Sequence, residues 1–240
     1  MKDHLLDLVQ HTYDLGCIDL IKVTGTTADT TVNGVAEDKS VILEAQFANP
    51  VADFIGTFGM PNLGKLKTLI NLQEYREDAK LAITKRVTGE PDGITFENKA
   101  GDFRNNYRFM ASEIVNDKLK TLKFKGVNWH ITFEPTVAAI QRLRMQAQAN
   151  SEEPNFQVKT ENKNLKFFFG DHSTHSGNFV FQPDVTGTLK HSWSWPVAQV
   201  ISILGLTGDK TMKISDDGCM QITVDSGMAV YNYILPAQTK

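Results

Sequence analysis

The sequence has little cysteine and no long hydrophobic run. Only two of its 240 residues are cysteines, Cys17 and Cys219, which is too few for a disulfide framework or a cysteine-built structural zinc site. The longest apolar run covers residues 200–206, whereas a membrane-spanning helix needs about 20 such residues. These shortages exclude a disulfide-stabilised scaffold, and they favour a reducing cytoplasm and no membrane partner.

Motifs of the common enzyme classes are also missing. Residues 59–65 have the spacing of a phosphate-binding loop, but Leu66 stands where a Ser or Thr is needed for Mg²⁺. No Gly-x-Ser-x-Gly nucleophile elbow occurs. Asp171, His172 and His175 have the chemistry of metal ligands, but their short spacing in a Gly/Ser turn favours a solvated hairpin loop. We therefore predict no enzyme, no cofactor and no metal site.

Charge of one sign is not in large excess either. The chain has 25 basic and 28 acidic residues and a net charge of −3, which on average argues against a surface coated for phosphate binding. It is 41% hydrophobic and 22% charged, as is typical of chains that bury a core. The length suits one large domain or two of about 120 residues, since domains usually run to about 100–150.

Hydrophobic periodicity and turn residues predict an α+β chain. The expected helices cover residues 3–13, 62–72, 134–149 and 196–206. The expected strands cover residues 18–24, 30–35, 41–47, 79–87, 94–98, 106–112, 156–160, 165–169, 179–182, 189–195, 211–214, 220–224 and 228–235. The lysine-rich residues 113–125 are expected to form an exposed, extended connector.

The predicted element order repeats along the chain. Each half reads helix, several strands, helix and three strands, and residues 106–111 and 232–237 agree at three of six positions. This favours an internal duplication over the alternative of one large mixed domain. We expect an N-terminal domain at 1–112, a connector at 113–125 and a C-terminal domain at 126–240.

Acidic residues are absent from three helical segments of the sequence. Residues 62–72, 136–150 and 196–206 contain no Asp or Glu, although Glu is a good helix former that usually decorates exposed helix faces. Burial explains this best for the uncharged segment 196–206. For 136–150 we favour a face turned toward something negative, because sparse cations among Gln and Ala suit loose contact with a phosphate backbone. No helix-turn-helix, zinc-finger or ribonucleoprotein motif indicates sequence-specific reading.

These features together resemble the DNA sliding clamps. Residues 60–69 and 229–236 are similar to a helix and the last strand of the clamps of T-even-type phages. The resemblance implies a PCNA-like α+β fold with two topologically similar clamp domains, helices lining a ring lumen and antiparallel sheets outside. It also implies a homotrimer closed head to tail.

The resemblance further implies which residues meet DNA. The expected DNA-facing residues are Lys65, Lys67, Arg142 and Arg144, with Lys2, Lys22 and His11 as weaker candidates. The first helix departs from this pattern, because Asp3, Asp7 and Asp14 make it acidic. Its share in a basic lumen is therefore in doubt.

Two protein contacts follow from the same resemblance. Tyr107 and Phe109 on an edge strand are expected to meet Phe179 and Phe181 of the neighbouring subunit. The residues expected to border a pocket for a partner's tail peptide are Leu119, Leu122, Phe124, Leu235 and Pro236.

The implied function is that of a processivity factor in phage DNA replication. The ring would encircle double-stranded DNA without regard to sequence and tether the replicative DNA polymerase, with a clamp loader as a further partner, in the cytoplasm of an infected bacterial host. Two alternatives stay open. One is a phage structural or assembly protein with tandem β-rich domains, and the other is a metal-dependent hydrolase that uses Asp171, His172 and His175.

Overall fold

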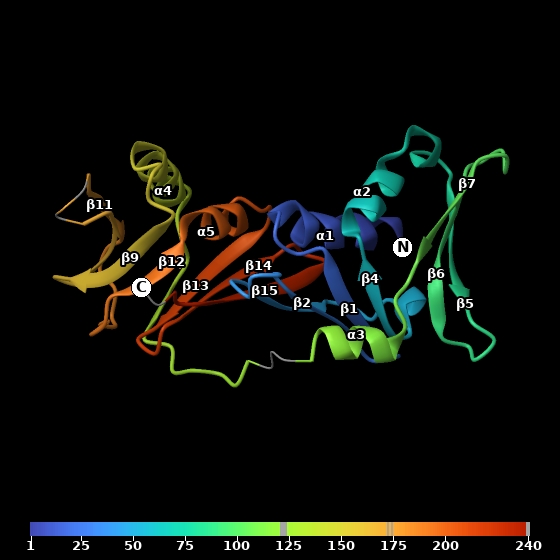
Figure 1. Cartoon of the computed structure of the whole chain (residues 1–240), viewed down its shortest axis with the longest axis horizontal. Coiled ribbons are helices and arrows are strands. Elements are labelled where there is room, and N and C mark those ends of the chain that lie inside the picture. The colour runs from blue at the N-terminus through green and yellow to red at the C-terminus, as the bar shows by residue number, and fades with distance from the viewer. Residues whose placement is uncertain (121–123, 172, 174, 239–240) are drawn as a thin grey trace. The chain divides into compact units, whose positions relative to one another are not determined.

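The chain folds into two compact units. A computed structural model describes residues 1–120, 124–171, 173 and 175–238 (Figure 1). Unit 1 comprises Met1–Lys123 and Ser226–Tyr231, and unit 2 comprises Phe124–Asp225 and Asn232–Lys240. The last strand, β15 (Ala229–Pro236), contributes residues to both units. The domain boundaries at 112/113 and 125/126 stay a prediction.

Unit 1 combines helices with two antiparallel sheets. Its helices are α1 (Lys2–His11), α2 (Leu63–Asn71) and α3 (Ser112–Lys118), with 3-10 turns η1 (Tyr13–Leu15), η2 (Ala52–Phe54) and η3 (Gln73–Tyr75). One sheet has the order β4-β1-β2-β3 followed by the first part of β15, and the other has the order β5-β6-β7. The strands are β1 (Leu20–Gly25), β2 (Thr30–Val35), β3 (Ile42–Phe47), β4 (Gly56–Pro61), β5 (Lys80–Lys85), β6 (Pro91–Glu97) and β7 (Arg104–Arg108).

The larger sheet of unit 1 has one buried face. Along β1, Ile21 and Val23 are fully buried, whereas Lys22 between them is only half-buried, as expected when side chains alternate between the faces of a strand. Helices α1 and α2 lie along one face of this sheet (Figure 1). Each helix is amphipathic, with fully buried leucines such as Leu5 and Leu66. The helices therefore cover the core face and leave their other side to solvent.

Unit 2 repeats this plan. Its helices are α4 (Val137–Ala149) and α5 (Val197–Leu204). One sheet has the order β11-β10-β9-β12, and the end of β15 continues into β14, β13 and β8. The strands are β8 (Ile131–Phe133), β9 (Asn155–Glu161), β10 (Asn164–Phe169), β11 (Gly177–Gln182), β12 (Trp193–Pro196), β13 (Asp209–Ser215) and β14 (Cys219–Asp225).

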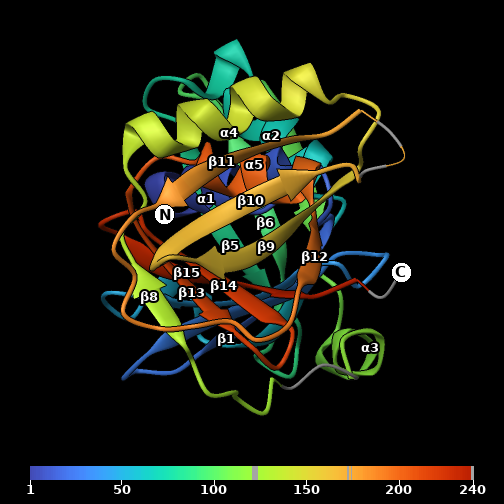
Figure 2. The same cartoon turned by 90° about the vertical axis from the view of Figure 1, so that its left-hand side faces the viewer.

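Stacked aromatic rings form the core between α4 and its sheet. The ring of Phe167 lies 4.6 Å from that of Phe156 and 4.3 Å from that of Phe181, centroid to centroid, in near-parallel pairs. Trp195 is fully buried, and its Nε1–H donates to the carbonyl of Leu235 (3.0 Å). Figure 2 shows α4 lying over β11. The aromatic strands thus give the second unit a rigid platform beneath its longest helix.

The two units have the same topology. In the described residues each runs helix, four strands, helix, three strands, apart from the extra elements α3 and β8. Strand β1 lies between β2 and β4, and its counterpart β9 lies between β10 and β12. The prediction of an α+β fold with two topologically similar halves is confirmed. None of the described helices is long and apolar enough to cross a membrane.

The extended connector predicted at 113–125 is wrong over its first part, where α3 forms. Val115 is fully buried, and it packs against Gly59 of β4, where a Cβ atom would lie only 2.9 Å from the valine. This long-range contact stabilises the helix. The alternating lysines and leucines that follow it in the sequence had instead predicted an extended segment. Strand β4 was not predicted either, because two glycines and a proline give its sequence the composition of a turn.

Candidate nucleic-acid interface

Helices α2, α4 and α5 contain no acidic residue within their observed bounds. The segments that lack acidic residues in the sequence therefore do form helices in the structure. Their basic side chains are Lys65 and Lys67 on α2, and Arg142 and Arg144 on α4. All but Lys67 are exposed, so α2 and α4 present positive charge to solvent, whereas α5 carries no charge.

Helix α4 presents both of its arginines outward. Thr136 caps the helix by accepting a hydrogen bond from Ala139 N (3.1 Å), and Leu143 is its fully buried anchor. The guanidinium carbon of Arg142 lies 5.4 Å from the centroid of the Phe179 ring, a cation–π contact that steadies the side chain. Among the described residues neither Arg142 nor Arg144 forms an ion pair. Their charge is available to an anionic partner.

Of the two lysines of helix α2, one forms an ion pair with a described residue and the other does not. Asn62, in the left-handed conformation (φ 54°), caps the helix through its side-chain oxygen and Lys65 N (3.3 Å). Lys67 Nζ instead lies 2.7 Å from Asp14 Oδ1. The hydrogen bond and the negative charge of Asp14 raise the pKa of Lys67. Lys67 is therefore a basic residue whose charge is already partly compensated.

The acidity of helix α1 is mostly hidden. Asp7 is only 9% exposed, and it accepts hydrogen bonds from Tyr231 Oη (2.6 Å) and Ser226 Oγ (3.2 Å). Burial opposes ionisation of this carboxyl, but the hydrogen bonds from His11 and Tyr231 outweigh it and lower the pKa of Asp7. Asp3 is the acidic residue that α1 exposes. The outer face of the helix is thus less negative than its sequence indicates.

The prediction that His11 faces DNA is wrong. Its side chain is 1% exposed, its Nδ1 lies 2.9 Å from the carbonyl oxygen of Asp7, and its ring stacks on Tyr231 at 4.4 Å. The histidine lies on the inner side of α1 because that side packs against the start of β15. His11 therefore belongs to the core of unit 1.

The other two weaker candidates are placed less favourably than the helix residues. Lys2 Nζ donates to the carbonyl oxygens of Tyr75 (2.6 Å) and Arg76 (2.9 Å), so its ammonium group is engaged with the end of η3. Lys22 points to the face of β1 opposite the buried Ile21. That face is not the one that the helices cover.

Strand β7 is an edge strand, as predicted, and β11 is another, but the aromatic side chains expected at the subunit contact do not face outward. Each strand ends its sheet. Tyr107, Phe109, Phe179 and Phe181 are at most 6% exposed, and Tyr107 Oη donates to the carbonyl of Pro61 (2.5 Å). These aromatic side chains therefore pack inside the monomer, and their place at a subunit interface stays a prediction. What the strands leave free is their backbone edge.

The predicted peptide-pocket residues have mixed surroundings. Leu235 is fully buried, so its side chain lines no open pocket, and that assignment is wrong. Leu119 and Phe124 are half-buried and Pro236 is exposed. The ring of Phe124 lies 6.1 Å from that of Trp129. Leu122 lies outside the described residues.

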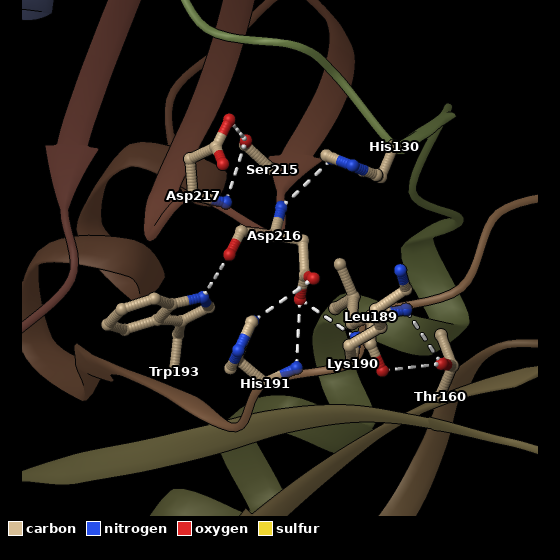
Figure 3. A network of polar contacts seen from close by, with 9 residues as sticks. All are labelled: His130, Thr160, Leu189, Lys190, His191, Trp193, Ser215, Asp216 and Asp217. Carbon is tan, nitrogen blue, oxygen red and sulfur yellow. Dashed lines mark hydrogen bonds and ion pairs between the residues drawn. The ribbon is translucent and has the colours of Figure 1, made fainter.

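A polar network around the β13–β14 turn was not predicted (Figure 3). Asp216 Oδ1 accepts hydrogen bonds from the backbone N–H groups of Lys190 (2.8 Å) and His191 (2.9 Å), and Oδ2 lies 3.1 Å from His191 Nδ1. The carbonyl of Asp216 accepts from Trp193 Nε1 (2.7 Å), and its N–H donates to His130 Nδ1 (3.0 Å). Desolvation opposes ionisation, but these contacts with His191 and Lys190 lower the pKa of Asp216.

This Asp216 network fastens three stretches of unit 2 together. It joins the residue before β8, the loop before β12 and the turn after β13, which are 25 to 86 residues apart in sequence. The same turn receives the C-terminal segment, because Ala237 N donates to the carbonyl of Gly218 (2.9 Å). The sequence around Asp216 and Asp217 shows only two acidic residues in a turn, so hydrogen-bond partners this far away in the sequence could not be predicted from it.

The described residues contain no group of three or more His, Cys, Asp or Glu side chains that could hold a metal ion. Asp171 Oδ1 accepts hydrogen bonds from the backbone N–H (2.8 Å) and hydroxyl (2.6 Å) of Ser173. His172 lies outside the described residues. The geometry that is described therefore lends the hydrolase alternative no support.

Solved structures share this fold over the whole chain. PCNA from Thermococcus kodakaraensis matches with a TM-score of 0.69 at 11% identity, covering 99% of this chain and 97% of that one. A. fulgidus PCNA, solved with the C-terminal region of FEN-1 bound to it, matches with a TM-score of 0.69 at 9% identity, covering 100% and 97%. No protein-family profile and no curated protein matches the sequence. The chain therefore has the PCNA clamp fold, and at such low identity its activity has to be argued from its own residues.

Proposed function

We propose that this protein is a sliding clamp that encircles duplex DNA as a ring and tethers a DNA polymerase to it. The observation that carries the proposal is the separation of charge on a clamp fold. The acid-free helices expose Lys65, Arg142 and Arg144, while the chain as a whole has a net charge of −3. A basic lining attracts phosphates, and an acidic exterior discourages DNA from binding outside the ring.

The sparseness of the positive charge suits movement along DNA. Phosphate contacts attract DNA without reading its sequence, and each contact adds to the salt dependence of binding. On either side of the arginines α4 exposes Gln141, Met145 and Gln148, none of which carries a charge. Few, exchangeable contacts allow the ring to slide while it stays around the duplex.

The internal repeat supports closure into a ring. Within unit 1, β3 pairs with the first part of β15. By position in the repeat, the counterpart of β3 is β11 and the counterpart of β15 is β7, and both end their sheets. We infer that β7 of one copy pairs with β11 of the next, so that the contact between subunits repeats a pairing already present within the chain. Three copies would close head to tail.

The tethering role requires a partner site on the ring. Phe124, beside Trp129, and the exposed Pro236 offer apolar surface in unit 2, suited to a peptide from a polymerase or a clamp loader. Tethering would raise the effective concentration of the polymerase at the primer end without any chemistry by the clamp itself. We place this activity in phage replication, in the cytoplasm of the bacterial host.

Charge reversal on α4 tests the proposal. The Arg142→Glu/Arg144→Glu variant should lose stimulation of processive DNA synthesis while still assembling, since both side chains are exposed and form no ion pair among the described residues. Lys159→Glu/Lys163→Glu, an equal change of charge on β9 and its turn, is the matched control. Unchanged processivity in the arginine variant would sink the proposal. Light scattering should give three times 26.8 kDa for both variants, whereas a lattice-forming structural protein would aggregate or stay monomeric.

A further inference from the structure

Lys67 is the basic residue of the acid-free helices that already has an acidic partner. Its ammonium nitrogen lies 2.7 Å from Asp14 Oδ1, and the two side chains are 45% and 33% exposed. In the described part of the chain Lys65, Arg142 and Arg144 form no such pair. Among the four basic side chains, Lys67 therefore differs from the other three in that a carboxylate lies next to its ammonium group.

The pair is built by the contact between α1, η1 and α2. A Cβ atom at Gly64 would lie 2.8 Å from Tyr13 Oη and 3.0 Å from its Cζ, so the glycine is what allows the Tyr13 ring to lie against α2. Asp14 follows directly and reaches Lys67, whose Nζ also lies 5.8 Å from the Tyr13 ring centroid. The fold, rather than the flexibility of a surface side chain, brings Asp14 to Lys67.

Among its described residues the second unit has no equivalent of this pair. Arg142 on α4 is supported by an uncharged ring, that of Phe179, at 5.4 Å. Arg144 extends toward Gly205 at the end of α5, where its Nη2 would lie 2.9 Å from an added Cβ, and helix C-termini carry partial negative charge but no full anion. The two units thus present unequal positive charge.

We propose that Asp14 attenuates DNA binding by competing with phosphate for Lys67, so that unit 1 binds duplex DNA more weakly than unit 2. This rests on the proposed function. A phosphate that recruits Lys67 must displace Asp14 and then lie beside its uncompensated carboxylate. Because the ion pair is exposed it is weak enough to be displaced, so Asp14 reduces the contact without abolishing it. A sliding ring gains from this, since a weaker contact is exchanged faster.

Replacing Asp14 by Asn tests this directly. The amide keeps the size of the side chain and removes its charge, so binding of a labelled duplex by the full-length protein should tighten, by at most about fourfold near 200 mM salt for each Lys67 that engages a phosphate. The slope of log affinity against log salt should steepen by at most about 0.9 per engaged Lys67, because the wild-type contact is weakened rather than lost. Asp78→Asn is the matched control, because it removes the same charge and a comparable ion pair, that with Lys99 (2.6 Å), from the same unit.

Removing Lys67 as well separates competition from a general change in charge. Asp14→Asn/Lys67→Gln should bind duplex DNA no more tightly than Lys67→Gln alone. The inference is overturned if Asp14→Asn behaves like Asp78→Asn, or if its gain persists without Lys67. If Arg142→Glu/Arg144→Glu weakens binding while Asp14→Asn leaves it unchanged, this inference fails alone. If neither variant alters DNA binding, the proposed function fails with it.

Discussion

The hydrogen bond from Tyr231 to Asp7 should contribute measurably to the stability of unit 1. Tyr231→Phe removes only the hydroxyl, because the ring that stacks on His11 at 4.4 Å stays in place. The lost hydrogen bond is short (2.6 Å) and reaches a carboxylate that is 9% exposed. Hydrogen bonds to charged groups contribute about 1.5–3 kcal/mol. We therefore expect a loss of about 2 kcal/mol, or about 4–8 °C in Tm for a chain of this size.

The same substitution should change how stability depends on pH. The folded state lowers the pKa of Asp7 below its ordinary value of 3.8, so its ionisation stabilises the protein above pH 3.8, and this contribution is lost as the pH falls through the lower, folded value. Without the Tyr231 donor the folded pKa of Asp7 rises. Acid unfolding of Tyr231→Phe should then begin at a higher pH than in the wild type.

Urea unfolding at several pH values, followed by circular dichroism, measures both effects. Tyr13→Phe is the control, because the Tyr13 hydroxyl makes no hydrogen bond to the described residues, and it should leave the acid transition in place. If Tyr231→Phe unfolds within about 0.5 kcal/mol of the wild type with the same acid transition, then Asp7 is not held by this bond. The explanation for the weakly acidic surface of α1 would then be refuted.

Two further substitutions follow from the structure. Asp216→Ala removes the hydrogen bonds accepted by a carboxylate that is 10% exposed, and it should destabilise unit 2 by about 2 kcal/mol in urea unfolding. The control Asp217→Ala loses one weak hydrogen bond of 3.3 Å and should destabilise unit 2 clearly less. Equal losses of stability in the two variants would contradict the role given to the Asp216 network. Gly64→Ala should displace the Tyr13 ring and separate Asp14 from Lys67. The affinity of this variant for duplex DNA should therefore rise as in Asp14→Asn. An unchanged salt dependence of DNA binding would contradict the role given to Gly64.

Local sequence patterns predicted most of the fold. Helix periodicity located α1, α2, α4 and α5, and alternation located most of the strands, because each element buries one face and its residues report that face directly. Helix α3 and strand β4 were not predicted, and besides the turn-like composition of β4 the two share a cause. Val115 and Gly59 are 56 residues apart in the sequence and pack against each other in the fold. The sequence around neither residue predicts this contact.

The candidate site was predicted less completely. The absence of acidic residues from three helices is visible in the sequence, so Lys65, Arg142 and Arg144 could be found. Composition could not show that Asp7 turns inward or that Asp14 reaches Lys67, because both depend on which face of a helix meets the next element. For the same reason composition could not show that Tyr107 and Phe179, which lie on edge strands, point into the core.

The measurement that tests the central claim most directly is retention of the protein on circular DNA. A ring loaded onto nicked circular duplex by its clamp loader should stay bound at a salt concentration that disrupts phosphate contacts, because it is held topologically. Cutting the circle once should release it by sliding off the ends. Equal retention on circular and linear DNA, or a salt-sensitive association that ignores the cut, would contradict the account.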